Sequence, residues 1–391
     1  MLTMNNDQRS LALLIGLAIT ATVTTQTSSL RRSQTCNRGT SPHSSRRVSV
    51  PGGRCRTWDI ANGAWVAESA PWAAAYPTLQ DMLAFFGVEG TSGDAHEIAL
   101  IENVRALTLT SFVRIAGCAN ASDPWVWRPH ACDLDPWESD EFCRRLAGGL
   151  LLVGDSMTKL MFMSIVAILL AAPPTAGLPV TSSNKSALVE VGSVRIAFLQ
   201  AGELASHLEA HPEYLAHYGV VVYNEGLHYR TPQAGLVDHV HATAALIESH
   251  TFPNTTLLWR DTPVGHYGCS HPGLMRSRPF ATRTEAEAWL KRHPGDPRYG
   301  WPHIAQENGA IAACVFPTTS RWRSLSAYTP LMTRPDRHPG NQTWDYSALA
   351  RISMRRKNPE VHIDCVHYCL PGPTDTLVHL LYHALGDDDI R

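Results

Sequence analysis

The chain has 391 residues, of which 44% are hydrophobic and 17% are charged, and its formal net charge is −2. A chain of this size can bury one large core, whereas its near-neutral charge excludes a general electrostatic attraction to the nucleic-acid backbone. We therefore expect one large domain behind an N-terminal tail, and no nucleic-acid partner.

The first feature along the chain is an apolar run, Leu11–Val23, which contains no charged residue. It is shorter than the roughly 20 apolar residues that cross a typical bilayer, unless the two following threonines are counted. The run is therefore either a short signal anchor or a cleaved signal peptide. A transit peptide is a third possibility, because residues 26–56 are rich in Ser, Thr and Arg and contain no acidic residue. The cysteine content argues against that third possibility.

The next segment, Trp58–Asp135, has an irregular pattern that is rich in tryptophan, with a helical stretch near Leu79–Phe86. We expect a lobe of loops that wraps onto the core. Its aromatic side chains either stack on sugar rings or anchor the packing of the lobe. The tryptophans in question are Trp125, Trp127 and Trp137.

Beyond Leu150 the pattern becomes regular, with short apolar runs that alternate with amphipathic stretches. This alternation predicts a mostly parallel sheet with helices on both faces, hence an α/β fold in three layers. We expect strands at 150–153, 189–198, 220–223 and 257–259, and helices at 157–171, 204–215, 235–249 and 376–385.

The sequence Leu150-Leu-Leu-Val-Gly-Asp-Ser156 predicts a buried strand, a sharp turn at Gly154, and a serine at the strand's carboxyl end. The helix that follows would place backbone N–H groups and the positive end of its dipole beside the Ser156 hydroxyl, where an oxyanion can form. Ligands of parallel sheets bind at the carboxyl ends of the strands. That rule puts Ser156, Asn224, Gly226 and Arg260 on one rim.

A serine nucleophile needs a base and a third group that fixes the tautomer of the base. Asp364-Cys-Val-His367 supplies both, because residues three apart on a turn let the carboxylate bond one imidazole nitrogen while the other faces Ser156. The distance in sequence is no obstacle, since such triads assemble in space. The C-terminal helix also carries Asp375, His379 and His383 at helical spacing. We interpret these three as an exposed polar stripe, with a metal site as the weaker alternative.

Eight of the nine cysteines lie in the expected domain, an even number that is typical of disulfides. Cys365 and Cys369 flank His367, and bridges to Cys269 and Cys314 would hold the catalytic turn. In the other half, Cys55, Cys118, Cys132 and Cys143 could pair among themselves. The spacing of Cys365 and Cys369 does not favour zinc, so no metal ligand is assigned.

Four Asn-x-Ser/Thr sequons are candidates for glycosylation and agree with an oxidising, lumenal compartment. They lie at Asn120, Asn184, Asn254 and Asn341.

These motifs resemble the trichome birefringence-like and PC-esterase group of the GDSL (SGNH) hydrolase superfamily, from about Cys55 onward. The blocks that carry the resemblance are Gly63–Val66, Trp127–Leu134, Gly154–Ser156, Tyr223–Tyr229, Leu258–Pro263 with His266, and Asp364–Thr376. One departure is Met157–Lys159, where plant members typically have Leu-Ser-Arg. The resemblance implies an SGNH-hydrolase-like three-layer sandwich, with a loop-rich, disulfide-stapled N-terminal lobe.

It also implies a Golgi-resident polysaccharide O-acetyltransferase that forms an acyl-serine, or an acetyl esterase of the same fold. A non-catalytic glycan-binding protein of the secretory pathway is the alternative from another class. The implied partners are a polysaccharide or oligosaccharide acceptor and, through the N-terminal segment, a membrane. No bound cofactor is expected, but an acetyl donor is required, either acetyl-CoA or another acetyl ester.

Roles follow from this mechanism. Ser156 is the expected nucleophile, His367 the base and Asp364 its orienting carboxylate. The oxyanion donors are expected to be the Ser156 N–H, the Gly226 N–H and the Asn224 amide. The residues assigned to substrate binding are Asp155, Arg260 and His266, with a buried ion pair as the alternative for Arg260.

The polar stretch before the domain cannot bury enough apolar surface to fold, so it predicts a flexible stem. Because the resemblance implies a type II membrane protein of the Golgi lumen, we favour the anchor over a secreted form. The expected organisation is a cytosolic tail (1–10), an anchor or signal peptide (11–25), a stem (26–54) and one catalytic domain (55–391), divided into an N-terminal lobe (55–147) and an α/β core (148–391).

Overall fold

The computed structural model describes most of the expected domain. The described residues are 53–55, 60–68, 70, 123–170, 180–182, 186–191, 193–228, 234–269, 277–295, 299–316, 321–338 and 364–386. The predicted anchor, residues 26–52 of the predicted stem and the helix near residues 79–86 lie outside this part of the chain. The last two residues of the predicted stem, Gly53 and Arg54, form a strand, so the flexible stem was predicted to extend too far.

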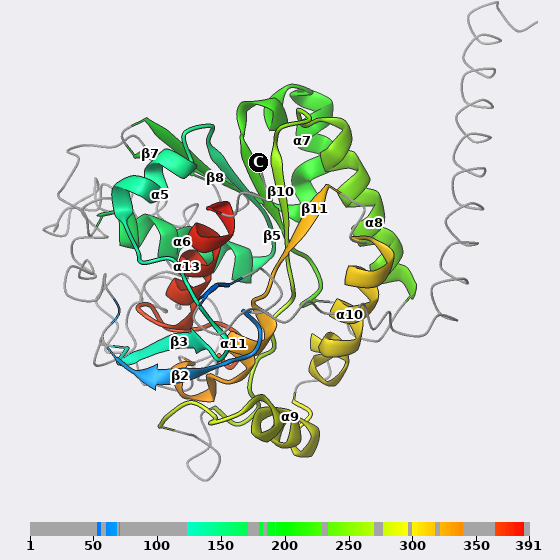
Figure 1. The fold of residues 1–391 in the computed structure, drawn as a ribbon. Helices are drawn as coiled ribbons and strands as arrows, with labels where there is room; N and C mark the ends of the chain where they lie inside the picture. Colours follow the sequence, from blue (N-terminus) through cyan, green and yellow to red (C-terminus); the bar gives the residue numbers. More distant parts are fainter. Residues whose placement is uncertain are drawn as a thin grey trace, which may run out of the picture.

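A seven-stranded sheet forms the centre, in the order β11-β10-β9-β5-β8-β7-β6 (Figure 1). The neighbours from β11 to β8 are all parallel, whereas β7 is antiparallel to both β8 and β6. The predicted mostly parallel sheet is therefore confirmed. The strands are β5 (Leu150–Gly154), β6 (Val180–Ser182), β7 (Ser186–Val191), β8 (Val194–Gln200), β9 (Val220–Tyr223), β10 (Thr256–Arg260) and β11 (Trp322–Leu325).

The central strand β5 shows why the fold has three layers. All its apolar side chains are fully buried, because both faces of a parallel sheet are covered by helices. Successive side chains of a strand point to opposite faces. Accordingly, Leu150 and Leu152 belong to one hydrophobic cluster, and Leu151 and Val153 belong to another.

The helices divide between these two clusters, with α5, α6 and α13 to one side of the sheet and α7, α8 and α10 to the other (Figure 1). The α-helices are α5 (Ser139–Arg145), α6 (Ser156–Leu170), α7 (Leu204–Ala210), α8 (Ala234–Ser249), α9 (Arg283–Arg292), α10 (Ile304–Cys314), α11 (Tyr328–Met332) and α13 (Pro373–Leu385). Short 3-10 helices occupy Ala201–Glu203, Tyr214–His217, Trp301–His303 and Pro335–Arg337. The three-layer α/β fold is confirmed.

Two predicted elements differ from the structure. The strand expected at 189–198 is a hairpin of β7 and β8, in which Val191 pairs with Val194 across a two-residue Gly-Ser connection. The helix expected at 204–215 ends at Ala210, because Pro212 disfavours helical backbone at the residue before it. Helices α9, α10 and α11 and strand β11 were not predicted.

The N-terminal lobe contains two small sheets. Strand β2 (Gly63–Ala67) is antiparallel to β3 (Trp125–Pro129), and β1 (Gly53–Arg54) is parallel to β4 (Cys132–Asp133). A disulfide joins Cys55, which follows β1, to Cys132 in β4. The expected disulfide-stapled lobe is confirmed.

Two of the three tryptophans singled out in the sequence, Trp127 and Trp137, make packing contacts. Trp127 is 1% exposed, and its indole N–H donates to the Ile60 carbonyl over 2.9 Å. Trp137 packs against Phe142 and Tyr382. The platform interpretation is therefore wrong for Trp127, since a ring without exposed surface cannot stack on a sugar.

The polar side chains of α13 are buried, so the expected exposed stripe is wrong. His379 Nε2 donates to the Asp135 carbonyl, and His383 Nε2 donates to the Cys55 carbonyl while its Nδ1 accepts from the Asp135 N–H. Asp375 accepts from the Gly372 N–H. These bonds join the C-terminal helix to the N-terminal lobe, which explains why the helix carries polar groups on a buried face.

Cys143 is a free thiol, which corrects its assignment as a disulfide candidate. It lies on α5 and packs against the larger hydrophobic cluster, so it serves as a small apolar side chain, and burial raises the pKa of its thiol. Cys314 and Cys369 are disulfide-bonded, whereas Cys118 lies outside the described residues.

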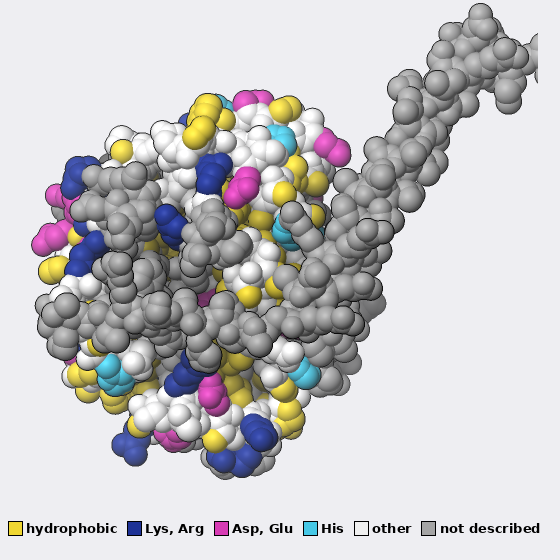
Figure 2. All heavy atoms as spheres, turned by 45° about the vertical axis from the view of Figure 1, so that its right-hand side comes forward, with side chains coloured by type: hydrophobic (Ala, Val, Ile, Leu, Met, Phe, Trp, Pro, Cys, Tyr) yellow, Lys and Arg dark blue, Asp and Glu magenta, His cyan; other side chains and the backbone are white. Residues whose placement is uncertain are grey.

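The described surface carries no strong charge asymmetry on the face shown in Figure 2, where basic and acidic side chains are interspersed. Of the four sequons, Asn254 lies in the described part of the chain and is exposed before β10. Within the described ranges, none of the helices has both the length and the apolar character needed to span a membrane.

Candidate active site

The turn between β5 and α6 positions Ser156. A Cβ on Gly154 would lie 2.2 Å from Thr158 Oγ1 and 2.7 Å from the Asn224 carbonyl oxygen, so a larger residue does not fit. Ser156 is the first residue of α6 rather than the residue before the helix. The nucleophile candidate therefore lies at the positive end of a 15-residue helix, at the carboxyl edge of the central strand.

Asp155 caps this helix. Its Oδ1 accepts hydrogen bonds from the backbone N–H groups of Met157 (2.9 Å) and Thr158 (3.4 Å). The side chain is buried, so the assignment of Asp155 to substrate binding is corrected to a structural role at the turn. Asp155 therefore binds the N–H groups of the second and third residues of the helix. The N–H of the first residue, Ser156, has no acceptor among the described residues.

The structure brings the three predicted triad residues together. His367 Nε2 lies 2.8 Å from Ser156 Oγ, and His367 Nδ1 lies 2.9 Å from Asp364 Oδ2. The carboxylate favours a proton on Nδ1, which leaves Nε2 free to accept the serine proton. This is the arrangement that activates a serine for attack on an ester carbonyl.

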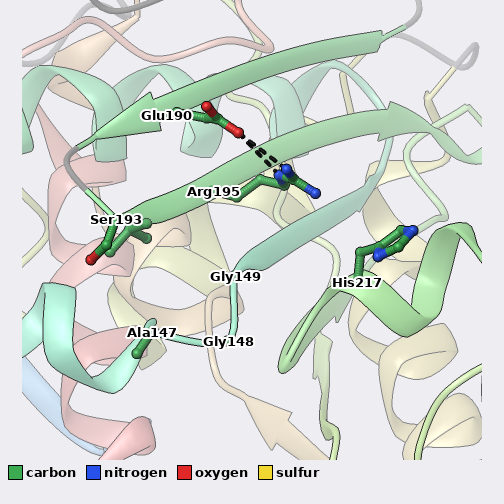
Figure 3. A pocket seen from close by; sticks show the side chains of 8 residues that line it. Ala147, Gly148, Gly149, Glu190, Ser193, Arg195 and His217 are labelled. Atoms are coloured by element: carbon green, nitrogen blue, oxygen red, sulfur yellow. Dashed lines mark hydrogen bonds and ion pairs between the residues drawn. The ribbon is translucent and has the colours of Figure 1, made fainter.

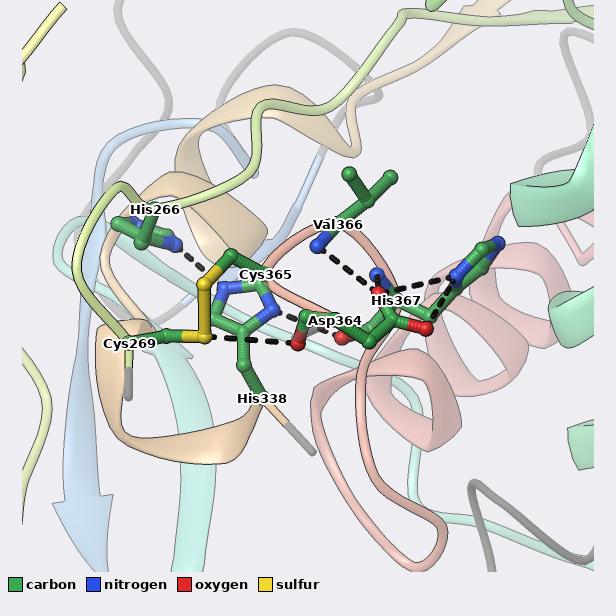
Figure 4. Close-up of a disulfide and its surroundings, with 7 residues drawn as sticks. All are labelled: His266, Cys269, His338, Asp364, Cys365, Val366 and His367. Carbon is green, nitrogen blue, oxygen red and sulfur yellow. Dashed lines mark hydrogen bonds and ion pairs between the residues drawn. A yellow bond between two sulfur atoms is a disulfide. The ribbon is translucent and has the colours of Figure 1, made fainter. Parts of the chain in front are cut away.

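The turn that carries Asp364 and His367 is held from several sides (Figure 4). Asp364 Oδ1 accepts from the backbone N–H groups of Val366 and His367, over 3.1 and 3.0 Å. A disulfide joins Cys365, between these residues, to Cys269. Cys269–Cys365 is one of the bridges predicted to hold the turn. The neighbouring Asp364 is 6% exposed.

Removing the Cys269–Cys365 disulfide by a double change to alanine is expected to lower the free energy of unfolding by about 2–4 kcal/mol, because the bridge closes a long loop. Any hydrolysis of a small ester by the triad should slow as well, since the turn loses its anchor beside the base. Urea unfolding and ester hydrolysis measure the two effects. Equal stability with and without the bridge would contradict the expectation, and Cys143→Ala is the matched control.

Asn224 and Gly226 differ in what they offer an oxyanion. The Asn224 amide donates to the Arg260 carbonyl (2.8 Å) and to Thr262 Oγ1 (3.1 Å), which uses both its hydrogens, and the residue has no exposed surface. The expected role of the Asn224 side chain as an oxyanion donor is thus corrected. Gly226 has φ 153°, and a Cβ there would lie 2.6 Å from Thr262 Oγ1. Its backbone N–H has no acceptor among the described residues and stays available.

Arg260 is a buried structural cation. Its side chain has no exposed surface, and Nη2 donates to Thr158 Oγ1 (2.9 Å) and to Asn224 Oδ1 (2.5 Å). Nη2 also lies 4.0 Å from Asp155 Oδ1. The assignment of Arg260 to substrate binding is corrected, because it ties α6 to the end of β9 from behind the nucleophile.

His266 is likewise buried, with 1% of its surface exposed, so its assignment to substrate binding is corrected too. Its ring contacts His338 and the Met332 carbonyl. All three residues assigned to substrate binding are buried, and each contacts the turns that carry the triad.

Sequence reasoning missed Asn308 on α10, which clamps the loop beside Gly226. Its side chain accepts from the Thr262 N–H and donates to the Thr262 carbonyl, both over 2.8 Å. Its neighbour Glu307 is 8% exposed, and Glu307 Oε1 has no hydrogen-bond partner among the described residues. No motif marks these residues, since α10 was not predicted.

Burial raises the pKa of the Glu307 carboxyl from 4.5 to about 7. The folded chain therefore holds this proton more tightly than the unfolded chain, and the resulting stability is present below pH 4.5 and lost as the pH rises through 7. Glu307→Gln should raise the free energy of unfolding at pH 8 by about 1–3 kcal/mol and leave it nearly unchanged at pH 4.5. Urea unfolding at both pH values checks this, with the exposed Glu287→Gln as control. A gain that is the same at both pH values would contradict it.

A cavity of about 380 Å³ lies at the opposite end of the sheet (Figure 3). It is lined by Gly149, which precedes β5, and by the exposed ion pair of Glu190 and Arg195. Since Ser156 follows the other end of β5, this cavity is separate from the triad.

The chain is similar in sequence to one protein family and to several plant proteins. Residues 299–384 match PC-Esterase, described as a GDSL/SGNH-like acyl-esterase family found in Pmr5 and Cas1p. This segment includes Asp364 and His367. The chain is also 22% identical to Xylan O-acetyltransferase 14 of Oryza sativa subsp. japonica, over 66% of this chain and 67% of the relative. It is 22% identical to Protein trichome birefringence-like 35 of Arabidopsis thaliana, over 67% of this chain and 66% of that protein.

A shorter match, 42% identical over 55 residues, is to Protein trichome birefringence-like 24 of Arabidopsis thaliana. It covers 14% of this chain and 12% of that protein. The predicted resemblance to the trichome birefringence-like and PC-esterase proteins is confirmed.

Proposed function

We propose that this relative of the PC-esterase and trichome birefringence-like proteins is a polysaccharide O-acetyltransferase that works through an acyl-serine intermediate. The observation that carries the proposal is the contact of Ser156 Oγ with His367 Nε2 at 2.8 Å, with His367 Nδ1 at 2.9 Å from Asp364. The name of one relative, Xylan O-acetyltransferase 14, supports the acceptor class.

In the first half-reaction, His367 Nε2 takes the proton from Ser156 as Oγ attacks the acetyl carbonyl of the donor. The tetrahedral oxyanion would be held by the backbone N–H groups of Ser156 and Gly226, at the positive end of α6. Collapse breaks the bond to the donor's leaving group, which takes the proton from His367. Acetyl-serine remains.

In the second half-reaction, a sugar hydroxyl gives its proton to His367 and attacks the acetyl-serine carbonyl. A second oxyanion forms in the same position, and its collapse breaks the bond to Ser156 Oγ, which regains the proton from His367. The products are the acetylated sugar and the free serine. The donor is acetyl-CoA or another acetyl ester, and the protein itself supplies every group that moves a proton.

An acetyl esterase is the second candidate, favoured by one observation. The His367 side chain is 25% exposed, so water can reach the base. Water in place of the sugar converts the same second half-reaction into hydrolysis.

The location proposed for the protein is the Golgi lumen, as a type II membrane protein anchored by residues 11–25. The disulfides Cys55–Cys132 and Cys269–Cys365 support an oxidising compartment, and the exposed sequon at Asn254 supports exposure to the glycosylation machinery.

The deciding experiment incubates the purified full chain with an activated acetyl ester and a panel of xylan-type and other plant oligosaccharides. Mass gain on the sugar and release of acetate are followed together, with Ser156→Ala as control. Serine-dependent acetylation of an oligosaccharide is expected. Serine-dependent acetate without any acetylated sugar would establish the esterase. The absence of both products would refute an enzymatic role.

Tyr267 is the candidate for contact with the acceptor sugar. Its ring is 51% exposed, and it lies two residues before Cys269, which is bonded to the catalytic turn at Cys365. Tyr267→Ala should raise the KM for the oligosaccharide about 2–10-fold through lost stacking and leave hydrolysis of a small ester unchanged. Phe252→Ala is the matched control, because this residue is 57% exposed but precedes β10 at the far end of the sheet. The same KM for both variants would contradict the assignment.

A further inference from the structure

Two buried histidines form a hydrogen-bonded row that ends on the backbone of His367 (Figure 4). His266 Nε2 lies 2.7 Å from the Met332 carbonyl oxygen, His266 Nδ1 lies 2.7 Å from His338 Nε2, and His338 Nδ1 lies 2.7 Å from the His367 carbonyl oxygen. His266 is 1% exposed and His338 is 6% exposed. All four ring nitrogens are therefore engaged inside the protein.

The number of protons in this row follows from its two ends. A carbonyl oxygen only accepts, so His266 Nε2 and His338 Nδ1 must each carry a hydrogen. A neutral imidazole has one N–H group, so two neutral rings would leave His266 Nδ1 and His338 Nε2 as bare lone pairs that face each other at 2.7 Å. A third proton between these atoms turns the repulsive contact into a hydrogen bond.

We propose that His266 and His338 share this third proton, so that the pair carries one positive charge behind the catalytic turn and acts as a positioning unit for Asp364 and His367. The proton itself is inferred from the geometry of the row alone. The part of the proposal that concerns the turn rests on the proposed function.

Charged side chains of both signs surround the pair of histidines. Asp336 faces His266 and Asp364 faces His338, and both carboxylates favour a cation, whereas Arg334 and His367 oppose it. Arg334 is itself paired with Asp336 and with a second buried carboxylate, Asp123. The charge of Arg334 is therefore compensated by these two carboxylates, which weakens its opposition to a cation on the pair.

The remaining neighbours are aromatic. The ring of Tyr368 lies with its centroid 4.4 Å from that of His338, within the range of a cation–π contact, and burial keeps the Tyr368 phenol neutral by raising its pKa. On the other side, His266 packs against Phe280 and Trp289, which do not titrate. Burial opposes a charge on either ring taken singly, and it lowers the pKa of His266 to about 3 and that of His338 to about 4. The shared proton is instead a property of the pair, since one charge is divided between two rings. Loss of the shared proton is opposed by the lone-pair contact that it would create.

The shared charge has two consequences for the triad. It favours the ionised form of Asp364, which keeps the carboxylate able to bond His367 Nδ1. It also disfavours a second positive charge at the neighbouring His367. A neutral pair that served only packing would do neither.

The direct test is nitrogen-15 NMR of the full chain labelled at histidine, at pH 7, with His266→Gln and His338→Gln used to assign the signals. A shared proton predicts that the four ring nitrogens show protonated or proton-sharing signals, and that none has the signal of a bare pyridine-type nitrogen. A bare pyridine-type signal from each of the two rings would overturn the proposal. This readout does not depend on activity, so failure of the proposed function leaves it intact.

The kinetic test compares the pH profile of kcat/KM for a small acetyl ester in the wild type and in His266→Gln, which donates to a carbonyl without titrating. We expect kcat to fall about 3–10-fold with KM unchanged, and the acidic limb to move to higher pH by about 0.5 unit or more, because His367 loses a neighbouring cation. His293→Gln, a half-buried histidine that packs on Trp289, is the matched control. A folded His266→Gln variant with an unmoved acidic limb would leave only a packing role and would refute the proposal.

Discussion

Replacing Ser156 by alanine is expected to lower the rate of acetyl ester hydrolysis and of sugar acetylation by about 10⁴-fold or more. The change removes the oxygen that is proposed to carry the acetyl group and leaves His367 without the hydroxyl that it contacts at 2.8 Å. The fold should be unaffected, because Ser156 is the first residue of α6 and alanine is compatible with a helix there. Stopped-flow release of the leaving group measures the loss, and circular dichroism checks the fold.

The matched control is Ser193→Ala, which changes an exposed serine at the opposite end of the sheet. It should retain full activity. If Ser156→Ala kept more than about one tenth of the wild-type rate, the acyl-serine mechanism would be wrong and the glycan-binding alternative would gain. Mass spectrometry of the wild type, quenched during turnover, should also show an added acetyl group on the peptide that contains Ser156.

Replacing Arg260 by methionine should lower the free energy of unfolding by about 3–5 kcal/mol, because it removes one partner of a buried polar network. Thr158 Oγ1 and Asn224 Oδ1 would each lose their donor, and the Asp155 carboxylate would lose its nearest cation. Asp155 Oδ2 already has no hydrogen-bond partner among the described residues, so Arg260 is the group that compensates this buried carboxylate. Activity should fall with stability, since these atoms surround the turn that carries Ser156.

Urea unfolding followed by tryptophan fluorescence measures the change in stability. Arg195→Met is the matched control, because that guanidinium is 44% exposed and pairs with Glu190 at the surface, where an ion pair contributes about 0–1 kcal/mol. Equal losses of stability in the two variants would contradict the structural role of Arg260. A stable Arg260→Met variant with a raised KM would return Arg260 to substrate binding.

The elements that local pattern specifies were predicted well. The continuous apolar run of β5, the glycine after it and the apolar helix that follows are each determined by neighbours in sequence, so the strand, turn and helix around Ser156 are where the pattern puts them. The Asp364–His367 contact was also predictable, because a three-residue spacing on a turn limits where the two side chains can meet.

The roles of the residues that hold the active site from behind were predicted poorly. Asp155, Arg260 and His266 were assigned to substrate, yet all three are buried behind the reacting atoms. Polar residues in a motif near a nucleophile look alike in sequence whether they face the ligand or the core. Burial depends on which helices and loops cover them, and α9, α10 and α11 were not predicted.

The sequence by itself determined the α/β class, the strand that ends at Ser156 and the identity of the three triad candidates, because each rests on periodicity or on residues close together along the chain. Only the tertiary structure decided that His367 meets Ser156, that Cys269 bridges Cys365, and that His338 joins His266 in a row behind the turn. These contacts join residues separated by tens to hundreds of positions. They form because burial of the two apolar faces of the sheet brings their loops together, and no local pattern along the chain encodes that meeting.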